Sequence, residues 1–474
     1  MASDSESSPV GKDFPYAERY GVLRAIPEEG LERAAILSQI AEMARGEDAF
    51  WETGKCSGTM YRGDLDHYEF LAECFAPFAH VNALQRDMCP SATRFEGEII
   101  AMALDLMHAA AVAGHHPADE PCGSVTGGGT DSIVTALLAY RNSARSERGI
   151  EVPNIVLPRT AHPAFHKGCH MFGIEVVNAP VGADITKVDV DFVADNIDDN
   201  TIAVVGSAGN YPYGTIDPID QLAEIAEQRG VGLHVDGCLG GFILPWGEEL
   251  GYDVPIFDFR LPGVTTISAD THKYGYGFKG TSTLLFRSKE LRKHQYFLMT
   301  DWPGGKYFSP GLAGSRSGGL LAATWASMAS LGRNGYREIA RQIFETAFAM
   351  QEIVRGHREL RILGDPTFCF SFNSDEFDIY HVNDFMRQRG WRFNGQQYPN
   401  AIHMCVTGPQ TQPGVVEAFA SDLAEAVGYA KDPPSPEPFS GAVYGGVPGG
   451  PTPEADDFIR DVMVGLLDKM QSVP

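Results

Sequence analysis

Lys273 lies in the stretch whose residue types are best suited to chemistry. An apolar and small run from Thr265 to Ala269 precedes it, and a glycine-rich turn after it leads into a second apolar run from Thr283 to Phe286. This pattern predicts a strand, an exposed loop and a second strand. Few other charges surround the lysine, so we expect desolvation to lower its pKa and to make it an imine-forming nucleophile. A hairpin with an incidental lysine is the alternative for this stretch alone.

An imine-forming lysine commonly carries pyridoxal phosphate, which needs a carboxylate at the pyridine nitrogen, a phosphate cradle and a group packed on the ring. Asp236 ends the apolar run 231–236, where a carboxylate is costly unless it is paired, and a protonated pyridine nitrogen is a suitable partner. A buried salt bridge or a helix cap is the alternative. We favour the ring because small residues that leave room for it follow: Gly237, Cys238, Gly240 and Gly241.

A glycine-rich turn, residues 124–132, precedes a predicted helix at 133–145 and offers a phosphate site. Backbone N–H groups at a helix N-terminus and the helix dipole favour an anion, and Thr130 and Ser132 add hydroxyl donors. The turn has the spacing of neither the common nucleotide-binding loop nor the dinucleotide-binding loop. A tight connection without a ligand is therefore an equally good interpretation of the turn alone.

Alternating strands and helices are predicted to bring these loops together. We expect strands at 154–158, 175–179, 201–207 and 232–236, and helices at 164–172, 188–196 and 219–229. The alternation predicts an α/β fold with a mainly parallel sheet, helices on both faces, and ligands beyond the carboxyl ends of the strands. His162 follows the first of these strands and can lie over a bound ring, although a loop histidine with ordinary hydrogen bonds is the simpler interpretation.

The flanking regions differ in character. Residues 1–20 resemble a flexible arm, and helices are expected at 31–45 and at 95–113, the second capped by Ser91 or Thr93. Beyond residue 320 we expect helices at 320–331, 336–357, 381–389, 415–429 and 456–470, strands within 361–372, 391–393 and 401–407, and a Pro/Gly-rich loop at 432–453. The chain is thus divided into an N-terminal arm with helices (1–90), a large cofactor-binding domain (91–320) and a smaller α+β domain (321–474).

Composition limits the possible partners. The 474 residues are 43% hydrophobic, enough for a large core, and the net charge of −25 disfavours nucleic acid and anionic membranes. Eight scattered cysteines form no C-x-x-C pair, so no zinc or redox motif is indicated and a cytoplasmic protein with reduced thiols is expected. The polar N-terminus suggests no secretory signal, and the run 99–114, interrupted by Asp105 and His108, is too short to span a membrane. We expect a soluble protein without a transmembrane segment.

With these motifs in view, the chain resembles pyridoxal-phosphate enzymes of the group II decarboxylase family, which have the aspartate-aminotransferase-like fold (fold type I). Within that family it is most similar to the sphingosine-1-phosphate lyases. The resemblance runs from about residue 50 to the C-terminus, and its motifs are specific through their combined order and spacing. They are the segments 122–132, 234–242, 268–275, 313–319, 377–380 and 441–445.

On the cofactor side, the resemblance implies that Lys273 binds pyridoxal 5′-phosphate through an imine. Asp236 would pair with the pyridinium nitrogen, and His162 would stack on the ring. The phosphate would be held by Gly129, Thr130 and His272, and by Ser315 of the partner subunit in a homodimer with its active site at the subunit interface.

On the substrate side, the resemblance implies a retro-aldol cleavage of the C2–C3 bond of a phosphorylated long-chain base, giving a fatty aldehyde and phosphoethanolamine. Tyr61, Tyr211 and Lys279 would line this side, and Lys279 is the local positive charge that a phosphorylated substrate needs in an acidic protein. The acid and base candidates are these three residues and the freed Lys273. Eukaryotic lyases of this kind carry an N-terminal membrane span, and none is expected here.

Two other functions remain as alternatives. An α-decarboxylase of glutamate or an aromatic amino acid would share Lys273 and Asp236, but the extended segment 274–279 and the segment 441–445 favour the lyase. A non-catalytic homologue that binds sphingolipid is disfavoured because Lys273, Asp236 and Lys279 are all present. Three departures from the family pattern are Gln85 where histidine is usual, Gly127 in place of serine and Gly237 in place of alanine.

Overall fold

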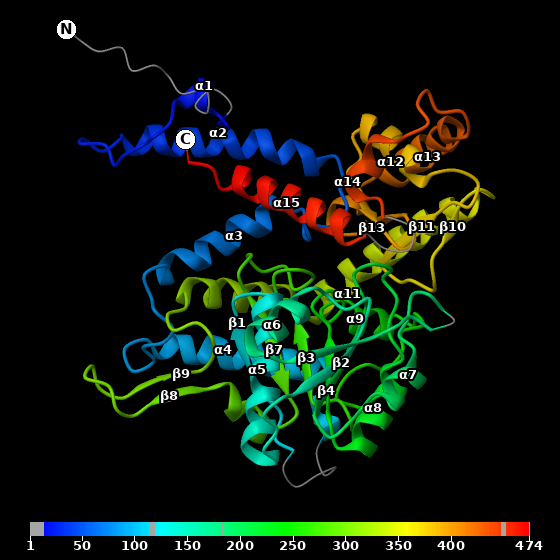
Figure 1. Ribbon diagram of the computed structural model, residues 1–474. Helices are drawn as coiled ribbons and strands as arrows, with labels where there is room; N and C mark the ends of the chain where they lie inside the picture. Colours follow the sequence, from blue (N-terminus) through cyan, green and yellow to red (C-terminus); the bar gives the residue numbers. More distant parts are fainter. Residues whose placement is uncertain (1–13, 113–118, 183, 447–451, 474) are drawn as a thin grey trace.

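The structure, a computed structural model, describes residues 14–112, 119–182, 184–446 and 452–473 (Figure 1). Parts of three predicted segments lie outside these residues. They are residues 1–13 of the predicted arm, the end of the apolar run at 113–114, and residues 447–451 of the predicted Pro/Gly-rich loop.

A seven-stranded sheet carries the predicted site loops, in the order β1-β7-β6-β5-β4-β2-β3. Within it β7 runs antiparallel to both of its neighbours and the other pairs are parallel, so the predicted mainly parallel sheet is confirmed. The strands are β1 (Cys122–Thr126), β2 (Asn154–Pro158), β3 (Glu175–Ala179), β4 (Thr201–Ser207), β5 (Gly232–Asp236), β6 (Thr266–Ala269) and β7 (Ser282–Phe286). The bounds predicted for β2 to β5 are those observed, whereas β1 was assigned to the glycine-rich turn.

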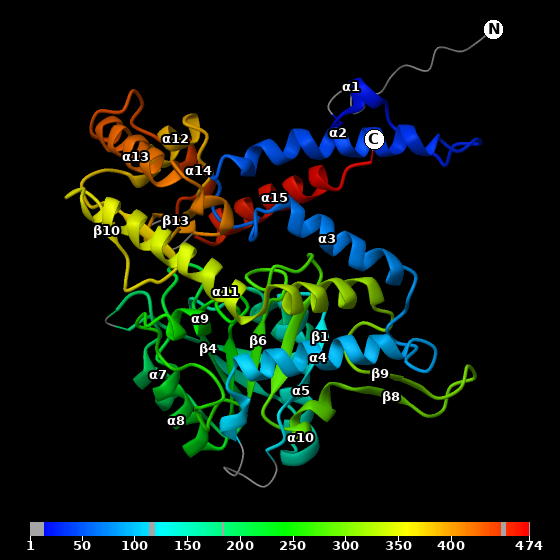
Figure 2. The same ribbon diagram turned by 180° about the vertical axis from the view of Figure 1, so that it is seen from behind.

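Helices cover both faces of this sheet because successive side chains of a strand point to opposite sides. In β2, Ile155 and Leu157 pack with α5 (Gly129–Arg148) and α6 (Ala164–Phe172), and Val156 packs into the core of the other face. The helices of that other face are α4 (Pro90–Leu106), α8 (Ile219–Arg229), α9 (Leu244–Glu249) and α11 (Gly318–Arg355), and α7 (Val190–Asp195) lies beside α8 (Figure 2).

Of two helix predictions, one was confirmed and one was wrong in detail. The two helices expected at 320–331 and 336–357 are both present within α11, where they meet at a kink at Gly332, whose φ is 57° and ψ is 178°. Glycine tolerates a positive φ, so the backbone leaves the helical conformation at this residue and the chain bends between the two helices. α4 begins at Pro90, directly after Cys89, and has no side-chain cap, so neither Ser91 nor Thr93 caps it. Proline is favoured in the first helical turn because its missing N–H is not needed there.

A smaller antiparallel sheet packs against the far end of α11. Its order is β10-β11-β13-β12, with β10 (Arg361–Ile362), β11 (Cys369–Asn373), β12 (Asn394–Gln396) and β13 (Ala401–Cys405). The helices α12 (Ile379–Gln388) and α13 (Val415–Lys431) cover it, and α14 (Phe439–Tyr444) lies in the region predicted as a loop. The division of the chain into three parts at residues 90 and 320 stays a prediction, and α11 begins just before the second boundary.

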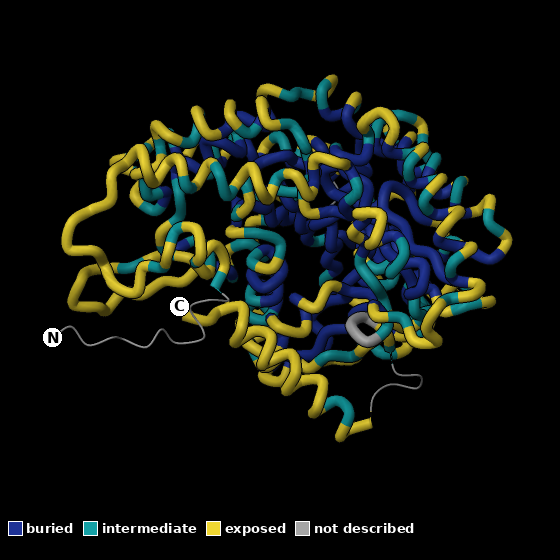
Figure 3. The backbone as a smooth tube through the Cα atoms, turned by 90° about the horizontal axis from the view of Figure 1, so that it is seen from above, coloured by how far each residue is buried: buried dark blue, intermediate teal, exposed yellow. Residues whose placement is uncertain are grey.

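The remaining elements are peripheral: α1 (Ala17–Tyr20), α2 (Arg33–Glu52), α3 (Leu65–Phe75), α10 (Lys289–Arg292), the unpredicted hairpin β8 (Phe297–Met299) and β9 (Tyr307–Ser309), and α15 (Pro453–Met470). α15 has no buried residue, and Figure 3 shows this last helix as an exposed segment beside the buried centre of the molecule. Across the described ranges, none of the helices combines the length and the apolar composition that crossing a bilayer requires.

Candidate active site

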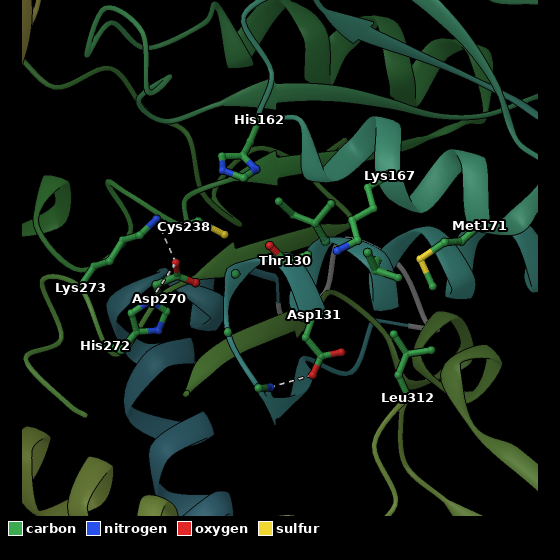
Figure 4. A pocket seen from close by; sticks show the side chains of 15 residues that line it. Thr130, Asp131, His162, Lys167, Met171, Cys238, Asp270, His272, Lys273 and Leu312 are labelled. Carbon is green, nitrogen blue, oxygen red and sulfur yellow. Dashed lines mark hydrogen bonds and ion pairs between the residues drawn. The ribbon is translucent and has the colours of Figure 1, made fainter. Parts of the chain in front are cut away.

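A cavity of about 550 Å³ opens where the ends of β1, β5 and β6 meet, at the edge of the sheet that the fold predicts for a ligand. Its size is typical of a small-molecule site. Five of the predicted site residues line it: Gly129, Thr130, His162, His272 and Lys273. Figure 4 shows His162, Thr130 and Lys273 facing the same space from different elements.

Lys273 follows β6 on a loop that is mostly buried, so the predicted exposed loop was wrong. The lysine side chain is 23% exposed and lines the cavity. The predicted lowering of its pKa was also wrong. Burial is the largest single effect and opposes the charge, but the Asp270 carboxylate, Tyr61 and Cys238 together outweigh it and hold the pKa of Lys273 above the ordinary lysine value. The sequence argument failed because it considered desolvation without the charge three residues earlier in the chain.

Asp270 is a site residue to which the sequence analysis gave no role. Its Oδ2 lies 3.0 Å from Lys273 Nζ, and its side chain is 2% exposed. Its Oδ1 is buried without a hydrogen-bond partner within the described ranges. The sequence pattern that could have identified it is the one used for Asp236, a carboxylate at the carboxyl end of a buried strand.

Asp236, at the end of β5, is buried and oriented by its neighbours. Its Oδ1 accepts hydrogen bonds from the Cys238 backbone N–H, at 3.0 Å, and from the Ser268 hydroxyl, at 3.3 Å. Its Oδ2 has no hydrogen bond to any residue that the structure describes. Cys238 lines the cavity, so Asp236 lies directly behind the cavity wall with one oxygen available.

The glycine-rich turn closes the cavity at the start of α5. Gly128 has φ of 139°, which an L-residue rarely adopts, and a Cβ on Gly129 would lie 2.7 Å from Asp270 Oδ2 and 3.0 Å from Cys238 Sγ. Gly129 therefore lets the Asp270 carboxylate and Cys238 pack directly against the start of α5. The N–H of Gly127 already donates to the Asp131 carboxylate at 2.7 Å, so the N-terminal N–H groups of α5 are the ones left to meet an anion.

Three further side chains border the same corner. The ring of His162 is held by the Ala164 N–H, which donates to Nδ1 at 3.1 Å, and His272 donates from Nδ1 to the Thr281 carbonyl. Lys167, on α6, also lines the cavity and adds a positive charge that the sequence analysis missed. Nothing in its local sequence distinguishes it from a surface lysine, because only the packing of α6 against α5 brings it there.

Tyr61 and Lys279 form a second group next to Lys273. The Lys279 ammonium lies 4.6 Å from the centre of the Tyr61 ring. Burial, and then the nearby charge of Lys273, lower the pKa of Lys279 to about 8. Burial raises the pKa of Tyr61 well above the ordinary tyrosine value. The lysine with a lowered pKa is thus Lys279 rather than Lys273.

Tyr211 reaches this region from the loop after β4 and is held by the small sheet. Its ring centre lies 4.5 Å from that of His403, on β13. The Asn394 side-chain amide, on β12, donates to the Tyr211 hydroxyl at 2.9 Å, so the hydroxyl hydrogen remains free to donate elsewhere. Burial raises the pKa of Tyr211. Asn394 and His403 were missed because they are distant in sequence and become neighbours only through the small sheet.

Ser315 and Gln85 do not line the main cavity. Ser315 borders a separate cavity of about 210 Å³, together with Gly127 and Gly280, and its hydroxyl accepts a hydrogen bond from Asn82 at 3.0 Å. Gln85 is exposed on the neighbouring loop, which is tied to the Ser315 loop by the Ala83 N–H donating to the Arg316 carbonyl at 2.8 Å.

The residues present fit pyridoxal phosphate on three structural grounds. Asp236 has a free oxygen for a pyridinium nitrogen, the cavity is lined by the residues at the start of α5 where N–H groups can meet a phosphate, and Lys273 projects into the same cavity. A buried carboxylate with an open coordination side is costly unless a cation or a donor meets it. The site is therefore suited to a flat, phosphorylated aldehyde with a basic ring nitrogen.

Comparison with known proteins agrees with this geometry. The family described as the pyridoxal-dependent decarboxylase conserved domain matches residues 15–372. The chain is 57% identical to a sphingosine-1-phosphate lyase of Burkholderia pseudomallei K96243, with a TM-score of 0.91, over 97% of this chain and 100% of that structure. It is 40% identical to the sphingosine-1-phosphate lyase of Dictyostelium discoideum over 92% of this chain and 82% of that protein. A glutamate decarboxylase of Lactobacillus brevis, at 21% identity, a TM-score of 0.72 and coverage of 90% of this chain and 98% of that structure, shares the fold.

Proposed function

Because the chain belongs to the pyridoxal-dependent decarboxylase family, whose cofactor is pyridoxal phosphate, we propose that it is a sphingosine-1-phosphate lyase. It cleaves the C2–C3 bond of a phosphorylated long-chain base and yields a fatty aldehyde and phosphoethanolamine. The observation that carries this proposal is Lys279, an exposed lysine whose pKa the charge of Lys273 helps to lower, in a chain with a net charge of −25. A decarboxylase of a small amino acid has no need of a second lysine for a phosphate.

When bound, pyridoxal phosphate supplies a ring that accepts the electron pair left on carbon as the C2–C3 bond breaks. Asp236 would favour the protonated ring nitrogen through its free oxygen, and His162 would pack against the ring. The N–H groups at the start of α5, with Thr130 and His272, would hold the phosphate. Lys273 would form the covalent link from its place in the cavity wall.

The substrate side is built by Tyr61, Tyr211 and Lys279. Both tyrosines keep their protons near neutral pH because burial raises their pKa, so they act as hydrogen-bond donors. Tyr211 is oriented for donation, since Asn394 occupies the acceptor side of its hydroxyl. Lys279 keeps most of its charge at pH 7 and attracts the substrate phosphate, while its pKa of about 8 also permits proton exchange.

The proposed enzyme is a homodimer with its active site at the subunit interface. Two observations support this assembly. Ser315 and Gln85, which the family resemblance places at a cofactor site, lie outside the main cavity of their own chain. The β8–β9 hairpin also exposes large apolar side chains near them, Phe297, Leu298 and Phe308. Exposed apolar patches of this kind mark protein interfaces.

The assembly can be tested by mixing two inactive variants, Lys273→Ala and Ser315→Tyr. Recovery of activity after mixing and reassembly is expected, because one hybrid site then contains both native residues. No recovery in a verified hybrid dimer, or a monomer in solution that is fully active, would contradict the interface site. We also propose a cytoplasmic location, which the eight free cysteines support.

The function itself is tested by incubating the purified protein with pyridoxal phosphate and sphingosine-1-phosphate. We expect fatty aldehyde and phosphoethanolamine in equal amounts, and neither product from Lys273→Ala. Carbon dioxide from glutamate or an aromatic amino acid, with no aldehyde from the lipid, would refute the lyase and indicate a decarboxylase on the same fold.

A further inference from the structure

Asp270 is a buried charged residue that the roles above leave unexplained. It follows β6 directly, and its Oδ2 lies 3.0 Å from the Lys273 ammonium. Its Oδ1 is buried and meets no hydrogen-bond donor within the residues described. An ionised carboxylate in such a place is costly unless a cation accompanies it, so the position of Lys273 and that of Asp270 depend on each other.

The start of α5 fixes the Asp270 carboxylate. A Cβ built on Gly129 would lie 2.7 and 2.8 Å from its two oxygens, so the carboxylate lies directly against the first residue of that helix. α5 is 20 residues long, and its N-terminus favours negative charge. The helix N-terminus therefore favours the negative charge of the carboxylate in this buried place, and the cavity side is left for Lys273.

Several other groups face this ion pair. His272 Nε2 lies 3.8 Å from Asp270 Oδ2, and the charge of Lys279 also acts on the pair from the same loop. Cys238 faces it from the loop after β5, and Tyr61 from the loop before α3. Among these groups the Lys273 ammonium makes the short contact, so Asp270 is placed to act on that amine.

Any reaction that uses Lys273 as the covalent link requires the lysine to leave the cofactor and to return in each cycle. We propose that Asp270 is a positioning residue that receives the Lys273 ammonium whenever the lysine is not bonded to the cofactor. This inference rests on the proposed function for the identity of the substrate. The contact between Asp270 and Lys273 does not depend on that function.

The protons of this role balance as follows. Lys273 leaves with the proton that the incoming substrate ammonium gives up, and Asp270 holds the resulting lysine ammonium beside the cavity. A base takes the proton of the C3 hydroxyl as the aldehyde forms, and the lysine ammonium then gives its proton to C2 and becomes a neutral amine. The neutral amine is the form that bonds to the cofactor again and releases phosphoethanolamine, whose amine takes up the proton that came from the C3 hydroxyl.

The first test uses the full chain freed of cofactor and needs no substrate. The rate of imine formation with added pyridoxal phosphate is followed by absorbance between pH 7 and 10 in the wild type, Asp270→Asn and Asp270→Glu. Only the neutral amine reacts, and in this range its small fraction depends on how strongly the carboxylate holds the ammonium, so Asp270→Asn should raise the rate at each pH by about tenfold or more. Asp270→Glu should restore the wild-type rate. Equal rates in all three proteins would overturn the proposal.

A measurement on the wild type keeps this test decisive if Asp270→Asn does not fold. Acetylation of the cofactor-free chain over a pH series, read by mass spectrometry, gives the midpoints of Lys273 and of the exposed hairpin residue Lys306. The midpoint of Lys273 should be the higher of the two, because Asp270 stabilises its charge. A midpoint of Lys273 at or below that of Lys306 would overturn the proposal.

The second test separates the two products in a single turnover. In Asp270→Asn the aldehyde should appear at nearly the wild-type rate, whereas phosphoethanolamine release should slow by at least tenfold, because the lysine ammonium that delivers the proton is no longer held beside the cavity. Asp253→Asn, at an exposed carboxylate after α9, is the matched control and should release both products as the wild type does. Equal slowing of both products would overturn the proposal. Absence of aldehyde from the wild type would instead refute the lyase function and leave the first test to decide the role of Asp270.

Discussion

Lys279 gives the most direct prediction about how activity depends on pH. Its pKa is lowered to about 8, first by burial and then by the charge of Lys273. With that value, about nine-tenths of the protein carries the charge at pH 7 and about one-tenth at pH 9. If the charged form binds the substrate phosphate, kcat/KM should fall by about tenfold between these pH values. A lysine with an ordinary pKa would lose only about 4% of its charge over the same range.

The assay measures kcat/KM for a phosphorylated long-chain base from pH 6.5 to 9.5 in the wild type, Lys279→Arg and Lys279→Ala. Arginine stays charged throughout this range, so in Lys279→Arg kcat/KM should not fall above pH 7, and the variant should keep its activity at pH 9. Lys279→Ala should be low at every pH and should discriminate least between phosphorylated and non-phosphorylated bases. Tyr61 and Tyr211 cannot cause a fall of kcat/KM near pH 8, because burial raises the pKa of both above the ordinary tyrosine value.

The same fall of kcat/KM near pH 8 in Lys279→Arg would refute this reasoning, because the titrating group would then be another residue. An equal loss of activity on phosphorylated and non-phosphorylated bases in Lys279→Ala would also refute it. In that case Lys279 would serve the proton transfers and not the recognition of the phosphate.

Three further predictions follow from the cavity wall. Lys273→Ala should abolish turnover and lower the free energy of unfolding in urea by about 2 kcal/mol, because Asp270 loses its partner, and adding Asp270→Asn should recover most of that loss. Gly129→Ala should weaken cofactor binding at least tenfold in an absorbance titration, since its Cβ would lie 2.7 Å from Asp270. The control Gly97→Ala, at an open helical site, should leave cofactor binding unchanged and raise the free energy of unfolding by about 1 kcal/mol. Asp236→Asn should lower kcat for aldehyde release by about 100-fold, as expected when one preorganised electrostatic contact is removed, and unchanged kcat would exclude its pairing role.

Local patterns in the chain were sufficient for most of the large sheet. The strands β2 to β5 are apolar runs bounded by turn residues, and buried parallel strands have that composition wherever they occur. The position of the site followed from the same pattern, because ligands of such sheets bind at the carboxyl ends of the strands. The β8–β9 hairpin was missed, because its exposed strands are short and lack a buried face that would impose a clear alternation.

Local residue patterns were enough to determine the fold class and to single out the lysine proposed to link the cofactor, the carboxylate proposed to pair with its ring and the glycine-rich corner, since each depends on residue types within a few positions of one another. The tertiary structure alone decided the charge states. Asp270 raises the pKa of Lys273, and burial beside Lys273 lowers that of Lys279, which reverses the sequence expectation for the catalytic lysine. It also decided that Asn394 orients Tyr211, across 183 positions of the chain. Electrostatic energies depend on distance and on exclusion of water, and neither quantity is defined until the chain has folded.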